Sequence, residues 1–277
     1  NEIHRNTLDR WSLAKVGRFV RQVISSYKKV LGCDFDVLHD HGVWLPSNVG
    51  SVLGARLRRK PIVISLHGML MPWSLAHHRS KKKLAWFFYQ KRILSCASCL
   101  HVTSSSEAEA LRLLLPDARI VLLPLPIFAS ESCVRSKVDV QDDAKPTLKR
   151  ILFFGRIHPM KSLDLLLEAW ASLSLPDYEL RIVGPDEYGL RDQLMAFSCS
   201  LGIEKSVHFG SAVYGVEKEA EIMAADYCIY PSQSESFGLA IAEAMVIGTS
   251  VIASRNSFWH MIEDKKSGWV VDATVES

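Results

Sequence analysis

The stretch RILFFGRIHPMKSLDLLLEAW, residues 150–170, contains one strand, one turn and one helix. The short apolar run at 150–154 is typical of a buried strand, and Gly155 allows the chain a tight exit from it. Ser162 is predicted to cap the helix that follows. The apolar side chains of that helix recur at helical spacing and share one face: Leu163, Leu166, Leu167 and Trp170. A strand that leads into such a helix is the repeating unit of a parallel α/β sheet.

The same alternation of strand and helix extends over almost the whole chain, so we expect two doubly wound α/β domains. The expected strands lie at 35–39, 62–66, 99–103, 120–123, 150–154, 180–184, 207–209, 227–230, 250–254 and 269–273. Besides the helix after Ser162, the expected helices lie at 9–30, 47–58, 80–95, 106–115, 190–201, 216–224 and 238–247. The polar, aperiodic stretch 129–149 is interpreted as a linker between an N-terminal domain at 1–128 and a C-terminal domain at 150–277.

The composition favours a globular protein with sizeable hydrophobic cores. The chain has 277 residues, of which 48% are hydrophobic, and a net charge of +3, which by itself does not indicate a nucleic-acid partner. No apolar run approaches the roughly 18 to 20 residues that span a bilayer, and no secretory signal is visible. The six cysteines lack the spacing of a zinc site and are interpreted as reduced thiols of a cytosolic protein.

The stretch PSQSESFGLAIAEAMV, residues 231–246, places two carboxylates around the start of one helix. Glu235 lies in a Ser-rich turn, and Glu243 lies among apolar helix residues, where a carboxylate needs a partner. The free backbone N–H groups at a helix start suit an anionic or hydroxyl-rich ligand. Both carboxylates are therefore candidates for binding the hydroxyl groups of a ligand.

Two cations, Arg156 and Lys161, follow the strand at 150–154. Lys161 directly precedes the predicted helix cap, where a cation opposes the helix dipole by roughly 0.3–1 kcal/mol. This placement is favourable if an anion binds there; the alternative is a pair of solvated surface cations. In open α/β sheets, ligands lie beyond the carboxyl ends of the strands. Together with Glu235 and Glu243, these cations indicate a sugar-nucleotide site, in which they stabilise the charge of a departing diphosphate without a metal.

Two His-Gly pairs, His41-Gly42 and His67-Gly68, each directly follow an expected strand of the N-terminal domain. A histidine at such a strand end can act as an acid or base near neutral pH, or serve as a polar contact. The alternative is a histidine in an ordinary turn. The repetition of the pair at two equivalent places favours a functional role.

The run RSKKKLAWFFYQKR, residues 79–92, is basic and contains four consecutive aromatic residues, from Trp86 to Tyr89. Such a segment can rest on an anionic membrane surface. The alternative is a helix with a buried aromatic face and a solvated basic face. No nucleic-acid-binding motif accompanies the run, so we expect no nucleic-acid partner.

Arg156, Lys161 and the motif at 235–243 resemble the donor site of retaining GT-B glycosyltransferases of family 4. The first half is similar to the acceptor-side domain of bacterial members that build surface polysaccharides. The stretches that carry this similarity are DVLHDHGVW at 36–44, SLHGMLMPW at 65–73 and CLHVTSSSEAEAL at 99–111. The resemblance covers about residues 34–272 and implies the GT-B fold, an α/β architecture in which two Rossmann-like doubly wound domains face a cleft.

The resemblance implies a role for each matching donor-site residue. Arg156 and Lys161 would hold the diphosphate of the nucleotide, and Glu243 would bind the ribose hydroxyls. Glu235 would hold the donor sugar and the distal phosphate, helped by the backbone of Phe237, Gly238 and Leu239. The base would lie near VHFGSAV, residues 207–213, against the backbone around Val213.

The resemblance also implies the acceptor side and the course of the reaction. His67 would sit near the transferred sugar and, with Arg156, Lys161 and Glu235, belong to the catalytic group. His41, Gly42 and Gly68 would line the acceptor side. The anomeric configuration would be retained, the leaving phosphate would help to deprotonate the acceptor, and neither a metal ion nor another cofactor would be needed.

Three departures from the family pattern stand out. The family opens with a Gly-rich loop after its first strand, and no such loop precedes residue 34, so we expect the N-terminal domain to be incomplete and the chain to be a fragment. A glycine common in the family appears as Ser211. The usual Asn-Gly after the last strand of the N-terminal domain is replaced by Leu125-Pro126.

The expected function is that of a retaining hexosyltransferase with a nucleotide-sugar donor and a glycan or lipid-linked acceptor. The expected location is the cytoplasm, with peripheral contact to anionic membrane through residues 79–92. Two alternatives remain open from the sequence. One is a sugar-nucleotide-binding protein without turnover, and the other is a sugar-nucleotide epimerase of the same architecture.

Overall fold

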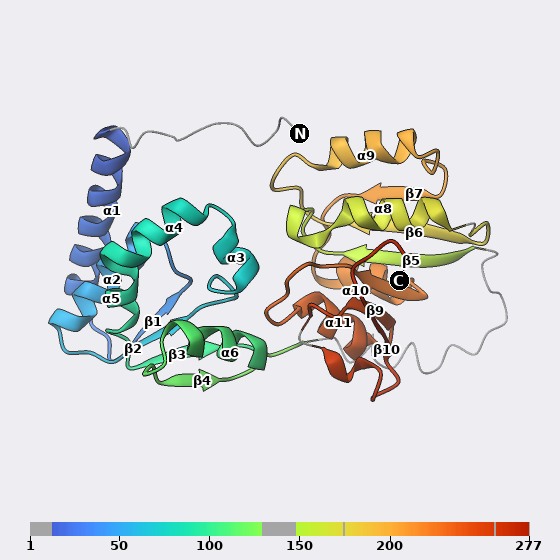
Figure 1. Ribbon diagram of the computed structural model, residues 1–277. Coiled ribbons are helices and arrows are strands. Elements are labelled where there is room, and N and C mark those ends of the chain that lie inside the picture. Colours follow the sequence, from blue (N-terminus) through green and yellow to red (C-terminus); the bar gives the residue numbers. More distant parts are fainter. Residues whose placement is uncertain (1–12, 129–147, 174, 258, 277) are drawn as a thin grey trace. The chain divides into compact units, whose positions relative to one another are not determined.

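The computed structural model describes residues 13–128, 148–173, 175–257 and 259–276 (Figure 1). By the contacts within it, the chain divides into two compact units, Asn1–Pro124 and Leu125–Ser277, here called unit 1 and unit 2. Each unit is described by itself. The expected linker at 129–149 lies outside the described residues except for its last two positions, of which Lys149 begins a strand.

Unit 1 is built on a four-stranded parallel sheet with the strand order β1-β2-β3-β4. The strands are β1 (Leu38–His41), β2 (Ile62–Ser65), β3 (Cys99–Val102) and β4 (Ile120–Leu122). The helices are α1 (Leu13–Gly32), α2 (Pro46–Leu57), α3 (Pro72–Ala76), α4 (Arg79–Ala85), the π-helix η1 (Trp86–Gln90), α5 (Lys91–Leu94) and α6 (Ser105–Leu114). Buried aliphatic residues from β2, β3, α2 and α6 form the core. Helices α1 and α2 pack closely, because Gly50 and Gly54 of α2 leave room for the backbone of α1.

Unit 2 is built on a six-stranded parallel sheet with the order β10-β9-β8-β5-β6-β7. The strands are β5 (Lys149–Phe154), β6 (Tyr178–Val183), β7 (Val207–Gly210), β8 (Tyr227–Tyr230), β9 (Ser250–Ser254) and β10 (Gly268–Val271). The α-helices are α8 (Leu163–Ser172), α9 (Arg191–Ser200), α10 (Gly215–Met223) and α11 (Leu239–Ile247). Short 3-10 turns lie at η2 (Pro159–Lys161) and η3 (His260–Ile262).

The strand order reverses direction between β5 and β8, which makes this the topological switch point of unit 2. From β5 the chain moves outward through β6 to β7, and then returns to β8 and moves the other way. Right-handed crossovers therefore place α8 and α9 on one face of the sheet and α10 and α11 on the other. The contacts between α8 and α9 and between α10 and α11 agree with this arrangement (Figure 1).

The exits of β5 and β6 approach each other so closely that a glycine is required. Gly184 has a φ of +155°, and a Cβ atom added to it would lie 1.8 Å from the carbonyl oxygen of Gly155. The N–H of Gly155 donates to the carbonyl of Val183 at 3.0 Å. The backbones of Gly155 and Gly184 are therefore in direct contact, and no side chain fits between the two loops at this point.

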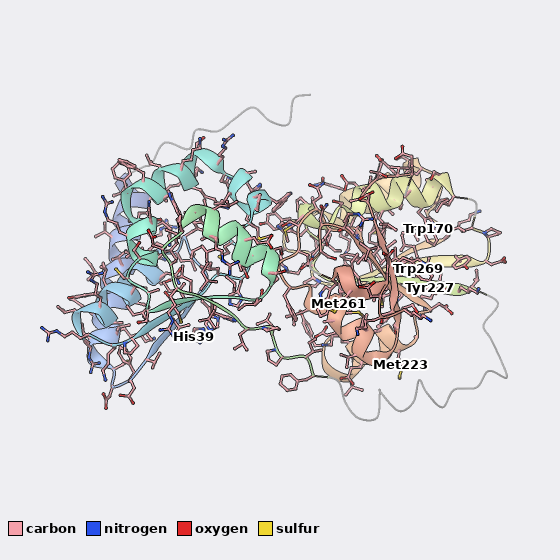
Figure 2. All side chains as sticks on the ribbon, turned by 60° about the horizontal axis from the view of Figure 1, so that its bottom comes forward. His39, Trp170, Met223, Tyr227, Met261 and Trp269 are labelled. Atoms are coloured by element: carbon pink, nitrogen blue, oxygen red, sulfur yellow. The ribbon has the colours of Figure 1, made fainter. Side chains whose placement is uncertain are left out.

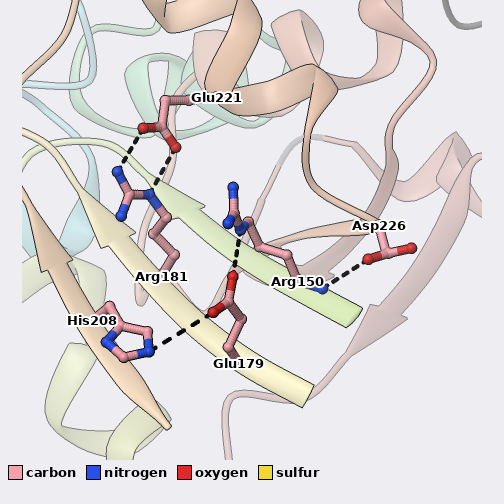
Figure 3. Close-up of polar contacts among 6 residues, drawn as sticks. All are labelled: Arg150, Glu179, Arg181, His208, Glu221 and Asp226. Carbon is pink, nitrogen blue, oxygen red and sulfur yellow. Dashed lines mark hydrogen bonds and ion pairs between the residues drawn. The ribbon is translucent and has the colours of Figure 1, made fainter. Parts of the chain in front are cut away.

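One face of the β5–β6–β7 sheet carries charged side chains (Figure 3). Arg181 on β6 makes two hydrogen bonds to Glu221 of α10, at 2.8 and 2.6 Å. Glu179, on the same face of β6, accepts from Arg150 of β5 at 2.6 Å and lies 3.8 Å from His208 of β7. The fully described helix α10 buries only Ile222, and the Arg181–Glu221 pair adds a polar attachment to the sheet.

On the outer half of the same sheet, β9 is flanked by β8 and β10. Tyr227 of β8 and Trp269 of β10 contact each other across the intervening strand, with ring centroids 5.8 Å apart (Figure 2). Apolar residues of β5, β6, β8 and β9 form the core of the unit together with α8 and α11.

The expected α/β architecture is confirmed, and three local predictions are corrected. The segment 80–95 is not one regular helix, because the π-helix η1 interrupts it and turns the side chain of Gln90 inward. The first strand begins at Leu38 rather than at 35, since pairing with β2 starts at Leu38 opposite Ile62. The short helix α3 was not predicted.

Among the described residues, no helix combines the length and the apolar character that a bilayer crossing requires.

Candidate functional site

Three loops, at the carboxyl ends of β5, β7 and β8, carry most of the candidate donor-site residues of unit 2. Arg156 and Lys161 follow β5, Val213 follows β7, and Glu235 follows β8. Glu243 lies on α11, which begins after the β8 loop. These elements surround the switch point, the place where open α/β sheets bind their ligands.

Lys161 and Glu235 meet across this switch point. Lys161 Nζ donates to Glu235 Oε2, although the two residues are 74 positions apart in the sequence. Their side chains are 13% and 16% exposed, so the pair is largely shielded from water. The backbone N–H of Gln233 donates to the carbonyl of Met160 at 2.9 Å and fastens the two loops together. A mostly buried cation and carboxylate are thus held side by side at the expected position.

Ser162 does not cap α8 in the way the sequence predicts. It occupies the N-cap position, but its φ of 48° is left-handed and its side chain accepts no capping hydrogen bond. Its Oγ is buried without a hydrogen-bond partner. The cap prediction is wrong because Ser162 ends the 3-10 turn η2 in a left-handed conformation, whereas a capping residue is typically extended.

Arg156 is paired with Glu187, a residue that the sequence did not single out. Arg156 Nη1 donates to Glu187 Oε2 at 3.0 Å, and about half of each side chain is exposed. The loop after β6 that carries Glu187 is organised by Asp186. This carboxylate accepts from the backbone N–H groups of Leu190 at 2.9 Å and Arg191 at 3.1 Å, and these bonds, led by that of Leu190, hold the pKa of Asp186 below its usual value.

Glu243 also has a partner that the sequence did not indicate. Lys218 Nζ, from α10, donates to Glu243 Oε1 at 2.8 Å, and the side chains are 23% and 21% exposed. The expectation that a carboxylate among apolar helix residues needs a partner is correct, and the partner in the structure is a lysine. No sequence signal could locate Lys218, because it lies 25 positions away on a different helix.

The start of α11 is held open by Gly238, whose φ is +76°. A Cβ atom there would lie 3.0 Å from Glu235 Cγ and 3.2 Å from Trp259 Nε1. Trp259 Nε1 donates to the carbonyl of Phe237, and the two rings make an edge contact with centroids 5.3 Å apart. Phe237 is buried, whereas Leu239 is 42% exposed at the first turn of the helix. The first backbone N–H groups of α11 have no carbonyl partner within the helix.

Tyr230 supports the same turn from beneath. Its hydroxyl donates to the carbonyl of Ala240 at 2.9 Å. Burial raises the pKa of Tyr230 well above its usual value, so the phenol stays neutral and remains a donor. Val213 is half-buried against the core of unit 2, and Ser211, two positions earlier, is exposed.

In unit 1, the structure brings the two predicted histidines together. His41 is the last residue of β1 and therefore lies within the strand, while His67 follows β2 with a left-handed φ of 50°. Their rings stack at 5.2 Å, and His41 Nδ1 lies 2.9 Å from His67 Nε2. Gly42 and Gly68 both have positive φ, and Gly42 N donates to the carbonyl of Ser65 at 2.7 Å.

A second chain of polar contacts crosses the same sheet through two histidines that the sequence did not single out as site residues. His101 Nε2 lies 2.8 Å from the carbonyl of Leu123, which can only accept, so this nitrogen carries the proton. His101 Nδ1 therefore accepts from Ser65 Oγ at 2.7 Å, and Ser65 Oγ in turn accepts from His39 Nε2 at 2.8 Å. This direction fixes the tautomer of both rings (His39 is labelled in Figure 2).

Burial lowers the pKa of both His39 and His67, and the neighbouring His41 lowers the pKa of each further. The buried carboxylate of Glu107 supports the loop that carries His67. Glu107 Oε1 accepts from the N–H of Gly68, and Oε2 accepts from the N–H of Thr103 at 2.9 Å. These hydrogen bonds to Glu107 hold the backbone next to His67 in place.

The basic aromatic run at 79–92 has a divided structure. Trp86 and Tyr89 pack against the core of unit 1, whereas Phe87 and Phe88 are 75% and 62% exposed. The expected alternative of one buried aromatic face therefore holds for two of the four rings. In the part of the chain that the structure describes, no group of three His, Cys, Asp or Glu side chains is arranged to hold a metal ion.

Family models match both halves of the chain. The model for "Glycosyl transferases group 1" matches residues 135–277, and the model for a "Glycosyl transferase 4-like domain" matches residues 3–126. A D-inositol 3-phosphate glycosyltransferase from Nocardioides sp. is 29% identical over 92% of this chain and 60% of the relative. A second protein of that name, from Saccharomonospora viridis, is 31% identical over 86% of this chain and 58% of the relative. The chain thus spans about 60% of the length of these curated relatives.

Solved structures share the fold at lower identity. A sucrose-phosphate synthase from Thermosynechococcus elongatus has a TM-score of 0.73 and 20% identity, over 99% of this chain and 68% of that chain. HepE from Anabaena, in complex with UDP and glucose, has a TM-score of 0.65 and 20% identity, over 96% and 70%. WaaG, a glycosyltransferase involved in lipopolysaccharide biosynthesis, has a TM-score of 0.65 and 16% identity, over 92% and 82%.

Proposed function

Because this chain belongs to the glycosyl transferases group 1 family, we propose that the protein is a glycosyltransferase that moves a hexose from a nucleotide-sugar to a glycan or lipid-linked acceptor. In this proposal the reaction retains the anomeric configuration and uses no metal ion or other cofactor. Its product enters a surface polysaccharide, and the protein works at the cytoplasmic face of the membrane.

The observation that carries the proposal is the Lys161–Glu235 pair at the switch point of unit 2. A cation for phosphate and a carboxylate for sugar hydroxyls are held there in contact, beside the first turn of α11 with its free N–H groups. A purely structural ion pair would not need a neighbouring helix start, a second carboxylate at Glu243 and a second cation at Arg156.

Donor binding in this proposal is an exchange of partners. The diphosphate takes Lys161 from Glu235 and Arg156 from Glu187, and the released Glu235 accepts hydrogen bonds from the hexose. The ribose hydroxyls donate to Glu243, which has a second oxygen beyond the one that Lys218 contacts. As the sugar–phosphate bond breaks, charge develops on the diphosphate, and the two cations stabilise it from fixed positions.

His67 is the proposed polar contact to the transferred sugar, with His41, Gly42 and Gly68 on the acceptor side. His41 orients the imidazole of His67 through the 2.9 Å contact between their ring nitrogens. The leaving phosphate removes the proton of the acceptor hydroxyl. The base of the nucleotide lies against the backbone around Val213.

The known proteins support a nucleotide-sugar donor and leave two acceptor chemistries to compare. HepE has been solved in complex with UDP-glucose. The curated relatives are named for D-inositol 3-phosphate, whereas WaaG is described as a protein of lipopolysaccharide biosynthesis. A phosphorylated polyol and a lipid-linked glycan are therefore the two acceptor classes that an assay of the proposed activity should contain.

Peripheral membrane contact is proposed for residues 79–92. Phe87 and Phe88 are exposed on a segment that also presents Lys81, Lys83 and Arg92 to solvent. Exposed aromatic rings and basic side chains together favour the surface of an anionic bilayer. Sedimentation with phosphatidylglycerol vesicles at low salt tests this, and the absence of co-sedimentation would remove the membrane contact from the proposal.

Titration calorimetry with UDP, GDP, ADP and the matching nucleosides tests the donor site. Lys161→Ala is expected to weaken binding of the diphosphate about tenfold and to leave the nucleoside unchanged, because a charge-assisted bond to phosphate is lost. Arg255→Ala, at an exposed pair in the same unit, is the matched control. Equal weakening of diphosphate and nucleoside would contradict the diphosphate role. An assay of hexose transfer then distinguishes the alternatives. Transfer with retention indicates a transferase, and the absence of transfer leaves a binding protein or an epimerase.

A further inference from the structure

Two apolar pockets lie side by side on unit 1, and none of His39, His41, His67 and His101 lines either of them. One has a volume of about 420 Å³ and the other of about 470 Å³, which falls within the roughly 300–1,000 Å³ of small-molecule sites. Trp44 and Lys82 line both pockets, so the two cavities are neighbours. Leu75 and Trp86 line the first, and Phe19, Leu84 and Phe88 line the second.

Trp44, which both pockets share, is held in place against backbone strain. Its φ is 77°, a left-handed value that is rare for an aromatic residue. The Trp44 N–H donates to Oε1 of the buried Gln90 at 3.2 Å, and Nε1 donates to the carbonyl of Met69 at 3.4 Å. Gln90 reaches this position at the end of the π-helix η1, an irregularity that is frequent at functional sites. These two hydrogen bonds fix the indole of Trp44 at the wall that both pockets share.

The rim of both pockets is cationic. Arg79, Lys82 and Lys83 line the first pocket, and Lys81 and Lys82 line the second. Among the described residues, no acidic side chain lines either pocket. Lys82 Nζ lies 5.7 Å from the centroid of the Trp44 ring and donates to the carbonyl of Ser74. Within the described ranges its charge therefore has a backbone carbonyl and a ring as partners, and no carboxylate forms an ion pair with it.

An apolar interior with a cationic rim fits one chemistry, that of a molecule with an apolar chain and an anionic head. We propose that these two pockets bind a single alkyl or isoprenyl phosphate, with the chain along Trp44 and the phosphate between Arg79 and Lys82. This inference rests on the proposed function, in which the bound molecule is the lipid part of a lipid-linked acceptor and the pockets are its binding site on unit 1. The binding itself requires no nucleotide and is measured without one.

The direct test is titration calorimetry with octyl, decyl and dodecyl phosphate below their aggregation concentrations. Each added methylene is expected to raise the affinity about fourfold as long as the chain still enters the pockets. Dodecyl maltoside, with the same chain and a neutral head, is expected to bind about tenfold more weakly, and inorganic phosphate is expected not to bind. Equal binding of dodecyl phosphate and dodecyl maltoside would overturn the assignment of the phosphate.

Variants locate the site. Ala85→Trp fills the second pocket and is expected to abolish the dependence on chain length, while Ala14→Trp on α1, outside both pockets, leaves it unchanged. If Ala85→Trp does not fold, Ala76→Trp at the exposed edge of the first pocket provides the same test. Lys82→Met is expected to weaken dodecyl phosphate about tenfold and dodecyl maltoside not at all, with Lys28→Met as the matched control.

Vesicles separate a bound lipid molecule from a bilayer surface. If phosphatidylglycerol vesicles bind the protein and its Ala85→Trp variant equally, and dodecyl phosphate does not bind, the segment is a surface patch and the proposal is wrong. If an amphipathic peptide without phosphate binds and dodecyl phosphate does not compete with it, the occupant is a protein segment and the proposal is also wrong. Nucleotide titrations on the same samples report separately on the donor site, so the two proposals can fail independently.

Discussion

Lys218 of α10 and Glu243 of α11 form an ion pair of 2.8 Å that joins the two helices on one face of the unit 2 sheet. Each side chain is less than one quarter exposed. The lysine therefore fixes one oxygen of the carboxylate and leaves the other to accept a ligand hydroxyl. In the proposed function, Lys218 acts through Glu243 and is a positioning residue for the ribose.

Replacing Lys218 with methionine is expected to weaken the binding of a ribonucleoside diphosphate about tenfold, because Glu243 loses the group that orients it. The matching 2′,3′-dideoxynucleotide lacks the hydroxyls that Glu243 would bind, so its affinity should not change. Lys205→Met, at an exposed position of the same unit, is the matched control. Calorimetric titration of the unmodified protein and both variants with each nucleotide checks the prediction, and equal loss for both nucleotides in Lys218→Met would show that Lys218 does not act through the ribose.

Replacing Lys161 with methionine leaves the mostly buried carboxylate of Glu235 without its partner. We expect a loss of about 2 kcal/mol in the free energy of unfolding, between the values for exposed and for buried pairs. The double variant Lys161→Met, Glu235→Gln should recover most of this loss, since no lone charge remains. Urea unfolding measures all three proteins. A single variant that costs no more than Arg255→Met, which breaks an exposed pair, would argue against the shielding of the Lys161–Glu235 pair.

Replacing Gly184 with alanine is expected to destabilise unit 2 by more than about 3 kcal/mol, because the new Cβ would overlap the carbonyl of Gly155. Gly189→Ala is the matched control. Its φ is also positive, at +66°, but nothing lies within 4 Å of the added atom. That variant should lose about 1 kcal/mol, the strain of a left-handed backbone alone. Thermal or urea unfolding compares the two, and similar losses would mean that the strand exits can separate.

The histidine cluster is expected to make unit 1 less stable in mild acid. Burial lowers the pKa of His39 and His67 in the folded protein, so below the ordinary value near 6.5 the unfolded chain binds protons more readily. Their contribution to stability is therefore complete above that pH and is lost as the pH falls through the lowered folded values. His41 and His101 add repulsion to both rings, whereas Asp40 opposes the shift at His39 and Glu107 opposes it at His67.

Unfolding free energies measured between pH 7 and pH 5 check this prediction. The double variant His39→Gln, His67→Gln should show a smaller decline over that range than the unmodified protein, and comparing the two cancels the titration of all other groups. An unchanged decline would place the pH dependence elsewhere in the chain.

Most of the fold could be predicted from the sequence, because apolar runs and helix periodicity report directly on burial. The strands at 62–65 and 227–230 were placed to within a residue or two for this reason. The predicted start of β1 was wrong, since Phe35 has the apolar character of a strand residue but lies outside the strand. Its ring instead contacts the guanidinium of Arg58, whose Cζ lies 5.0 Å from the ring centroid. Periodicity also could not reveal the π-helix, which lies between two α-helical segments and differs from them in its backbone hydrogen bonds.

The candidate site could be predicted in its charges but not in their pairing. Sequence patterns pointed to Arg156 because it directly follows a strand end, and to Glu243 because a carboxylate is unusual in an apolar helix. Their partners Glu187 and Lys218 belong to other loops and helices, and only the sheet order brings them together. The conformation of Ser162 was missed because it is set by the preceding 3-10 turn rather than by its own residue type.

The attachment of α10 has a consequence for the dynamics of unit 2. A helix that buries only Ile222 and is otherwise held by polar contacts, among them the ion pairs Arg181–Glu221 and Lys218–Glu243, opens at a lower free-energy cost than a helix with a larger buried face, and high salt lowers that cost further. Amide hydrogen exchange should therefore begin at α10, well before the sheet opens. Because α10 carries Lys218 and follows the loop of Val213, the side of the site proposed to hold the nucleoside can loosen while the Lys161–Glu235 contact stays closed.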